Sequence, residues 1–241
     1  MRKSERTYKL RATSQIRLLL LVASAVTIPL ATAQSNGGLA KGASTFDFRG
    51  FRLGMLLGEF RKTPPPVETP LSADVVPKCD IDEPLGPTRE QAIWRAIGVA
   101  RCEWSEPSPL SKFGSTASIH VARFRTDSYR LLFIGKPGDP EPRLFEMRFD
   151  VRSDAYLELA EALEGRFGRP SKVERTQVQN RLGAVFTNEI RRWTDRHGGV
   201  VELLRYTDSL DTTELRFTQS DYLAYFRKRQ REESSRLPAN L

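Results

Sequence analysis

Residues 129–151, YRLLFIGKPGDPEPRLFEMRFDV, decide the fold class of this chain. Tyr129–Ile134 and Arg143–Val151 are rich in aliphatic and aromatic residues, and the turn-forming residues 136–140 (KPGDP) separate them. In the second run, apolar residues alternate with mostly charged ones at the two-residue period of a half-buried strand, with Phe145, Met147, Phe149 and Val151 on one side and Leu144, Glu146, Arg148 and Asp150 on the other. The stretch predicts an antiparallel β-hairpin.

Further strands are predicted on both sides of this hairpin. Short runs of strand-forming residues bounded by turns occupy residues 100–104, 118–125, 184–194, 200–207 and 213–218. In the first of them, Ala100, Cys102 and Trp104 alternate with Arg101 and Glu103.

Four helices are predicted between and after the strands. Leu53, Leu56, Leu57 and Phe60 recur at helical spacing, and Pro64–Pro66 must end that helix. Thr88-x-x-Gln91 is a capping box for a helix reaching Gly98. A third helix begins at Asp154 and stops at Gly168 and Pro170, with an apolar face of Tyr156, Leu157, Ala160, Leu163 and Phe167. The last begins at Ser220 or Asp221.

Strands joined by short turns, with helices between the groups, favour an α+β fold: an antiparallel sheet with helices packed on one face. The order of elements also repeats, because a helix is followed by three or four strands twice. We therefore expect a first α+β unit at residues 46–152, with a Pro-rich loop at 62–87, and a second at 153–219, before a C-terminal helix and tail at 220–241. The identity between the two halves is too low to prove a duplication.

The first 33 residues have the three parts of a secretory signal peptide. Six bases and one acid lie in residues 1–17, an uncharged apolar run follows, and Ala31-Thr32-Ala33 is a cleavage site of the A-x-A type. The run is shorter than the roughly 20 apolar residues of a membrane-spanning helix, and it contains Pro29. We expect cleavage between Ala33 and Gln34, a flexible leader at 34–45, and a periplasmic or secreted mature protein.

Cleavage changes the charge of the chain. The full sequence has 38 bases and 30 acids, and removing the six bases and one acid of residues 1–33 leaves 32 and 29, a net charge of +3. The basicity of the full chain is therefore poor evidence for nucleic-acid binding, and we expect no nucleic-acid partner.

Cys79 and Cys102 are the two cysteines of the sequence. In an oxidising compartment such a pair usually forms a disulfide, which here would tie down the Pro-rich loop. A redox-active or metal-binding pair is the alternative, but there is no C-x-x-C and no histidine near either cysteine. We predict a structural disulfide.

Two stretches of the sequence resemble motifs of uncharacterised exported bacterial proteins. The first is FRGFRLGMLLGEFRK (48–62), and the second is LAEALEGRFGRPSKVE (159–174) followed by Trp193 and the strands VVELL and ELRF. The architecture of those proteins is similar to envelope domains of the SmpA/OmlA and beta-lactamase-inhibitor-protein type. The resemblance covers most of Phe46–Thr218 and implies helices on an antiparallel sheet, an envelope location and a protein-binding role. It implies no catalytic residues. This chain lacks a lipobox, and the Pro-rich loop replaces the usual Gly-x-Pro after the first helix.

Sites of catalysis or of metal binding are not indicated by any motif. The sequence lacks G-x-S-x-G, H-E-x-x-H, a P-loop and G-x-G-x-x-G. His120 in a strand and His197 in a turn are too few for a metal cluster, and Asp80, Asp82 and Glu83 lack the spacing of a calcium loop. We expect no cofactor and no metal.

The C-terminal helix carries an unusual pattern. Aromatic residues are followed at once by bases, which gives a candidate interaction surface of Tyr222, Tyr225, Phe226, Arg227, Lys228 and Arg229. Such a cluster suits an anionic membrane surface or an acidic partner. The alternative is that the aromatics pack the helix onto the sheet while the bases complement its C-terminal dipole.

These patterns favour a non-catalytic binding or structural module of the cell envelope, with another envelope protein as its partner. A carboxylate-dependent hydrolase of envelope material is the alternative, because paired carboxylates are brought together in space and not in sequence. Peripheral membrane binding through the C-terminal helix is a third hypothesis. The oligomeric state does not follow from the sequence.

Overall fold

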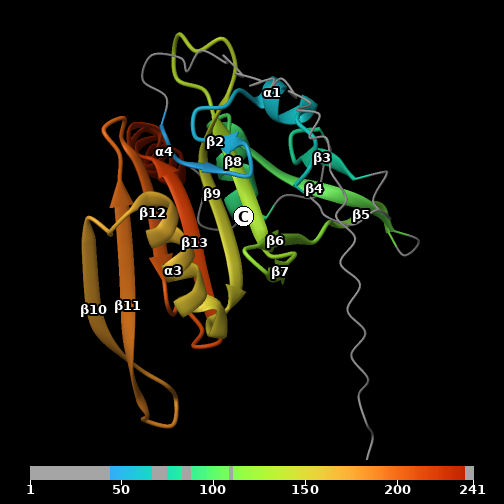
Figure 1. Ribbon diagram of the computed structural model, residues 1–241. Coiled ribbons are helices and arrows are strands. Elements are labelled where there is room, and N and C mark those ends of the chain that lie inside the picture. The colour runs from blue at the N-terminus through green and yellow to red at the C-terminus, as the bar shows by residue number, and fades with distance from the viewer. Residues whose placement is uncertain (1–43, 67–74, 83–87, 109–110, 237–241) are drawn as a thin grey trace, which may run out of the picture. The chain divides into compact units, whose positions relative to one another are not determined.

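A nine-stranded antiparallel sheet dominates the computed structural model, which describes residues 44–66, 75–82, 88–108 and 111–236 (Figure 1). Its strands are β3 (Val76–Cys79), β4 (Ala100–Ser108), β5 (Ser111–Thr116), β8 (Tyr129–Ile134), β9 (Arg143–Arg152), β10 (Lys172–Gln179), β11 (Val185–Thr194), β12 (Gly199–Leu204) and β13 (Thr212–Gln219). The order across the sheet is β10-β11-β12-β13-β9-β8-β4-β3, and β5 also pairs with β4. Two small hairpins, β1 (Asp47–Phe48) with β2 (Phe51–Arg52) and β6 (Ile119–Val121) with β7 (Phe124–Thr126), stand apart from it.

The described helices are α1 (Leu57–Lys62), α2 (Arg89–Ala96), α3 (Tyr156–Phe167) and α4 (Ser220–Ser234), with a 3-10 turn, η1 (Ser153–Ala155), before α3. The predicted α+β class and antiparallel sheet are confirmed. Both predicted units contribute strands to this one sheet, which is continuous through the pairing of β9 with β13. The predicted signal peptide at 1–33 and most of the predicted leader lie outside the described residues.

Helices pack on both faces of the sheet, whereas the sequence led us to expect them on one. Residues of α1 and α3 belong to the main hydrophobic cluster, and residues of α2 and α4 to a second cluster with Leu132, Ile134 and Phe145. The reason lies in β8, where Leu131, Leu132, Phe133 and Ile134 are all buried. A strand with four consecutive apolar residues needs cover on both faces, which a single layer of helices cannot supply.

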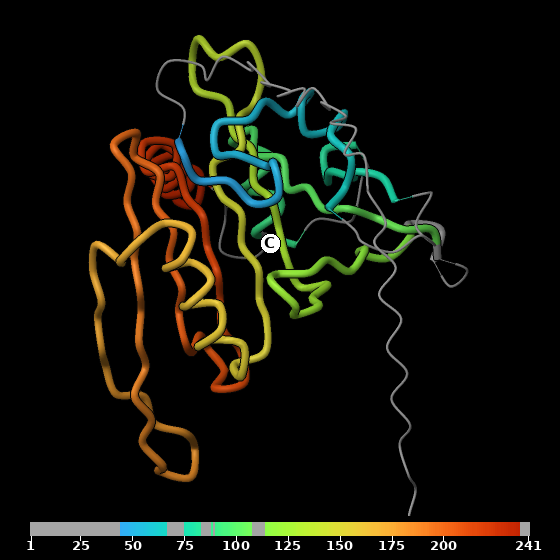
Figure 2. Tube along the Cα trace, viewed as in Figure 1, coloured from blue at the N-terminus to red at the C-terminus, as the bar shows by residue number. Residues whose placement is uncertain are grey.

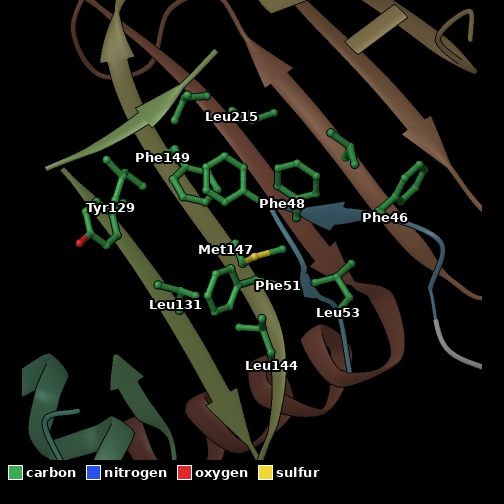
Figure 3. Packing of buried hydrophobic residues seen from close by; sticks show 14 of the residues in the cluster. Phe46, Phe48, Phe51, Leu53, Tyr129, Leu131, Leu144, Met147, Phe149 and Leu215 are labelled. Atoms are coloured by element: carbon green, nitrogen blue, oxygen red, sulfur yellow. The ribbon is translucent and has the colours of Figure 1, made fainter. Parts of the chain in front are cut away.

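The main cluster is built where the β1–β2 hairpin lies against β8, β9 and β13 (Figure 3). Phe48 packs on Phe149 with ring centroids 4.2 Å apart, and Phe51 packs on Trp104 at 4.9 Å. The helix predicted from Leu53 is therefore shorter than expected. Because the chain turns at Gly54, with φ +84°, the helix begins only at Leu57, and it ends at Lys62 before the prolines as predicted.

A β-bulge changes the predicted alternation of β9. Leu132 pairs with Glu146 but Phe133 pairs with Leu144, so Phe145 is an extra residue on β9. Phe145 consequently faces the second cluster, away from Met147, with which the sequence pattern had grouped it. A period-2 pattern cannot reveal such an insertion.

The start of α3 also differs from the prediction. Asp154 does not cap the helix; η1 precedes it, and Asp154 forms an ion pair with Arg152 at 3.3 Å. Leu157 is 64% exposed, and Leu159 takes its place on the buried face. The predicted stop at Gly168 is confirmed, with the left-handed φ of +76° that ends many helices.

Two further segments depart from the sequence pattern. The strand predicted at 118–125 is the β6–β7 hairpin, which turns at Ala122 with φ +55°. The strand β10 was not predicted, and all of its residues are exposed or half-exposed. In contrast, the capping box of Thr88 and Gln91 and the strand of Ala100, Cys102 and Trp104 are confirmed.

Candidate functional site: a charged groove on the sheet

The face of the sheet turned away from the main cluster is charged where α2 and α4 leave it uncovered. Arg130, Arg148 and Arg216 occupy directly opposed positions on β8, β9 and β13. Like charges opposite one another destabilise a sheet unless carboxylates compensate them. The compensating ion pairs are Arg130–Glu146 at 3.2 Å, Arg148–Asp150 at 3.0 Å, Arg148–Glu214 at 2.8 Å and Arg216–Glu214.

Glu214 lies beneath this row of arginines, with a side chain only 2% exposed. Burial raises the pKa of its carboxyl, and the charges of Arg216 and Arg148 oppose that effect. A buried carboxylate held between two guanidinium groups fixes both arginines on the face. The row is therefore a preformed feature of the sheet.

Two adjoining cavities form a groove beside this row. They measure about 350 and 360 Å³ and share Arg101, Glu103 and Thr116. We call their lining the charged groove: Lys78, Cys79, Asp80, Gln91, Arg101, Glu103, Thr116, Asp127, Ser128, Tyr129, Arg130, Arg148 and Asp150. Its floor crosses β3, β4, β8 and β9, so it requires four strands from distant parts of the chain.

Arg101 and Glu103 stand in the middle of the charged groove. They flank Cys102 on β4, so they share the face opposite to the buried Cys102. Both are half-exposed, and neither forms an ion pair with any residue that the structure describes. The groove thus presents one cation and one anion that form no ion pair within the part of the chain that the structure describes.

Asp80 closes one end of the charged groove. Its Oδ1 accepts a hydrogen bond from the backbone N–H of Arg101 at 2.9 Å, and its own N–H donates to the Arg101 carbonyl at 2.9 Å. Its Oδ2 is buried without a hydrogen-bond partner among the described residues. Burial raises the pKa of this carboxyl, while the hydrogen bond from Arg101 and the charges of Arg95 and Arg101 lower it.

The arrangement suits recognition of opposite charges. A guanidinium binds carboxylates through paired N–H groups, and a carboxylate accepts from amines and guanidinium groups. Residues two apart on a strand are separated by roughly 7 Å. Arg101 and Glu103 therefore match a partner segment that carries an acid and a base at the same spacing, as an extended chain does at alternate positions.

Among the described residues, the two carboxyls whose pKa burial raises do not form a pair with each other. These two carboxyls are those of Asp80 and Glu214. Asp80 directly follows β3, and β13 lies four strands from β3 in the sheet, which corresponds to roughly 19 Å. Glycoside hydrolysis requires carboxyl groups about 5–10 Å apart.

The predicted disulfide is present between Cys79 and Cys102. The two residues are directly opposed on β3 and β4, with Cα atoms 4.1 Å apart, and both are buried. The bond ties the edge strand β3 to the sheet directly below the charged groove, since Cys79 also lines it.

The aromatic residues of the C-terminal helix pack inward. Phe226 is buried, with its ring 5.3 Å from Phe145 and 6.2 Å from Trp94. The Tyr222 hydroxyl donates to Asp139 at 2.9 Å; burial and this hydrogen bond raise the pKa of Tyr222 to about 12. Tyr225 is half-buried against the same cluster.

The bases of that helix lie elsewhere on its surface. Arg227 and Lys228 are exposed, and Arg229 is half-exposed and pairs with Glu232 at 3.8 Å. The six residues of the predicted interaction surface are therefore divided between a packed side and a solvated side of α4. They do not form one aromatic and basic patch.

The remaining candidate residues are dispersed. His120 lies on β6 and His197 in the turn between β11 and β12. Asp82 binds Arg61 through both carboxylate oxygens, at 2.6 and 2.8 Å, and Glu83 lies outside the described residues. In the described ranges, no group of three His, Cys, Asp or Glu side chains is placed to hold a metal ion.

No family model, curated protein or solved structure matches this chain. Among the described helices, none is both long enough and apolar enough to cross a membrane.

Proposed function

We propose that this chain is an exported, non-catalytic binding module of the cell envelope, and that it takes a segment of another envelope protein in the charged groove. The observation that carries the proposal is the pair Arg101 and Glu103, two half-exposed opposite charges without an ion pair in the described structure. Elsewhere on this face, the arginines of the row already hold carboxylates.

Export supports the same proposal. The basic, apolar and A-x-A parts of residues 1–33 have the order of a signal peptide. The resemblance to SmpA/OmlA and beta-lactamase-inhibitor-type domains implies an envelope location and a protein partner. The charged groove is an open surface of the sheet that such a partner would contact.

A charge reversal tests the proposal. The exported form and its Arg101→Glu/Glu103→Arg variant are used to capture proteins from envelope extract, and captured proteins are quantified by mass spectrometry. We expect the loss of at least one protein that the native groove enriches, because both contacts become repulsive. The matched control exchanges the exposed pair Arg152 and Asp154, which lies on a different part of the chain, and should retain that protein. Equal capture by all three forms contradicts the proposal.

A further inference from the structure

The edge of the sheet at β10 is an open template for another strand. Among the described strands, β10 pairs with β11 alone. Asn180, just after it, bonds to Ala184 and Gly183, so its backbone groups point toward β11. Because this direction alternates along a strand, the N–H and C=O groups of Val173, Arg175, Gln177 and Gln179 point away from β11. They bond to no other described backbone group.

The β10–β11 hairpin also extends beyond its neighbours as a two-stranded arm (Figure 2). β11 pairs with β12 only from Ile190 to Thr194, so residues 176–187 have no third strand. The end of the arm is apolar and solvated: Leu182 is 93% exposed and Val185 is 61% exposed. Two-stranded ribbons are marginally stable alone, and an exposed apolar tip favours association.

A cavity of about 430 Å³ lies at the base of the same arm. Aromatic side chains form part of its wall, and polar ones the remainder: Phe46, Phe167, Trp193, Thr45, Arg166, Arg169, Ser171, Thr194 and Asp195. Ser171 directly precedes β10, so the cavity and the apolar tip lie at opposite ends of this strand. We call it the base cavity.

We propose that two copies of the chain pair antiparallel through their β10 edges, so that the Leu182 tip of each copy enters the base cavity of the other. A two-fold axis places residues opposite each other at equal distances from a central residue. If the two-fold axis passed through Glu174 or Arg175, that residue would lie directly opposite the same residue of the partner, and two like charges would meet. A centre at Thr176 opposes no like charges between Val173 and Gln179 and uses nearly the whole strand.

The register centred on Thr176 explains why the Leu182 tip and the base cavity lie at opposite ends of β10. It sets Asn180 opposite the partner's Lys172, so the turn that follows reaches the start of the partner's β10, where the base cavity opens. The bases of the strand are internally neutralised: Lys172 pairs with Glu174 at 2.6 Å and Arg175 with Glu189 at 2.6 Å. Pairing therefore unites two charge-balanced strands.

Two arginines at the ends of the edge make the register testable. Arg169 and Arg181 are exposed and form no ion pair with a described residue. In the proposed dimer, Arg181 lies opposite the partner's Ser171, two residues from the partner's Arg169. The two guanidinium groups repel each other. The affinity of the dimer should therefore rise when salt screens this repulsion, and also when either charge is reversed.

Cysteine cross-linking of the exported form reads the register directly. The described structure contains no free cysteine, so an introduced thiol gives an unambiguous cross-link. Thr176→Cys lies on the two-fold axis and should form a disulfide-linked dimer on oxidation, because directly opposed Cβ atoms are about 5 Å apart. Thr187→Cys, exposed on β11, is the control and should stay monomeric. Equal cross-linking of both, or of neither, overturns the register.

Sedimentation of variants separates edge pairing from other association. Gln177→Pro removes an outward N–H without breaking the hairpin and should abolish the dimer, and Leu182→Asp should weaken it on the order of a hundredfold. Arg181→Glu should strengthen it, and Arg169→Glu/Arg181→Glu should return it to the native affinity. A native protein that is monomeric at about 1 mM, or a dimer indifferent to Gln177→Pro, overturns the proposal.

Discussion

Ser44 is tied to Asp195 across 151 residues of sequence: its hydroxyl donates to the Asp195 Oδ2 at 2.7 Å. The same oxygen accepts the backbone N–H of Thr45 at 2.8 Å, while Oδ1 accepts the N–H groups of His197 and Gly199 at 2.8 Å each. One carboxylate thus fixes the start of the described chain to the turn between β11 and β12. Ser44 is buried there, at the end of the predicted leader.

Replacing Asp195 with Ala should lower the free energy of unfolding by about 2 kcal/mol, because the Ser44 hydroxyl and three backbone N–H groups lose their acceptor. Hydrogen exchange should rise at residues 44–46. Urea denaturation measures the stability, and Asp208→Ala, at an exposed carboxylate, is the control with a change below about 0.5 kcal/mol. An unchanged exchange rate at Thr45 contradicts this anchoring role.

Stability should fall in acid through Glu189. Although burial would raise the pKa of this carboxyl, hydrogen bonds from Arg191, Tyr156 and Arg175 lower it to about 2, against an ordinary 4.5. A lowered folded-state pKa gives stability that is present above pH 4.5 and is lost as the pH falls toward 2. Glu189→Gln should therefore cost about 2 kcal/mol at pH 7 and little at pH 2. The difference between native and variant unfolding curves at the two pH values tests this, and a pH-independent difference contradicts it.

Removing the disulfide should destabilise the fold without changing its secondary structure. Closing a loop of this length stabilises by roughly 3 kcal/mol in the chain-entropy description. We expect the double variant Cys79→Ala/Cys102→Ala to lose this free energy of unfolding, while its circular dichroism spectrum at ambient temperature stays unchanged. Reduction of the disulfide in the native protein is the control. An equal loss of stability there shows that the double variant is destabilised by loss of the bond and not by altered packing of the alanines. Equal stability of the reduced and oxidised forms would contradict the prediction.

The C-terminal helix should behave as a packed element. Phe226→Ala should cost about 3–4 kcal/mol, because Phe226 fills the space between Trp94 and Phe145. Arg227→Ala/Lys228→Ala, on the solvated side, should change the stability by less than about 0.5 kcal/mol. Thermal denaturation compares them. Co-sedimentation with anionic vesicles that depends on Phe226 in the folded protein would favour the membrane hypothesis instead.

Local patterns predicted much of the fold. The hairpin at 129–151, the capping box at Thr88 and the start of α4 at Ser220 are all set by neighbouring residues. Prediction failed where a feature depended on distant partners. β10 has the sequence KVERTQVQ, and since neither of its faces is buried, no apolar alternation marks it.

The charged groove could be anticipated only in part. The alternation of Arg101 and Glu103 with Cys102 and Trp104 does place both charges on the outer face. Their meeting with Arg130 and Asp150 depends on the order of β4, β8 and β9 in the sheet. Strand order is a property of long-range pairing, which periodicity within one strand does not encode.

Photo-cross-linking from the charged groove tests the central proposal most directly. A benzophenone side chain replaces Thr116, which both cavities of the groove share, and in a second protein it replaces the exposed Arg152. Irradiation in living cells should attach the Thr116 variant to a discrete envelope protein, with loss of that product when Arg101→Glu/Glu103→Arg is added. The Arg152 variant should give no such product. No cross-link from Thr116, or the same product from both positions, would contradict a binding function of the groove.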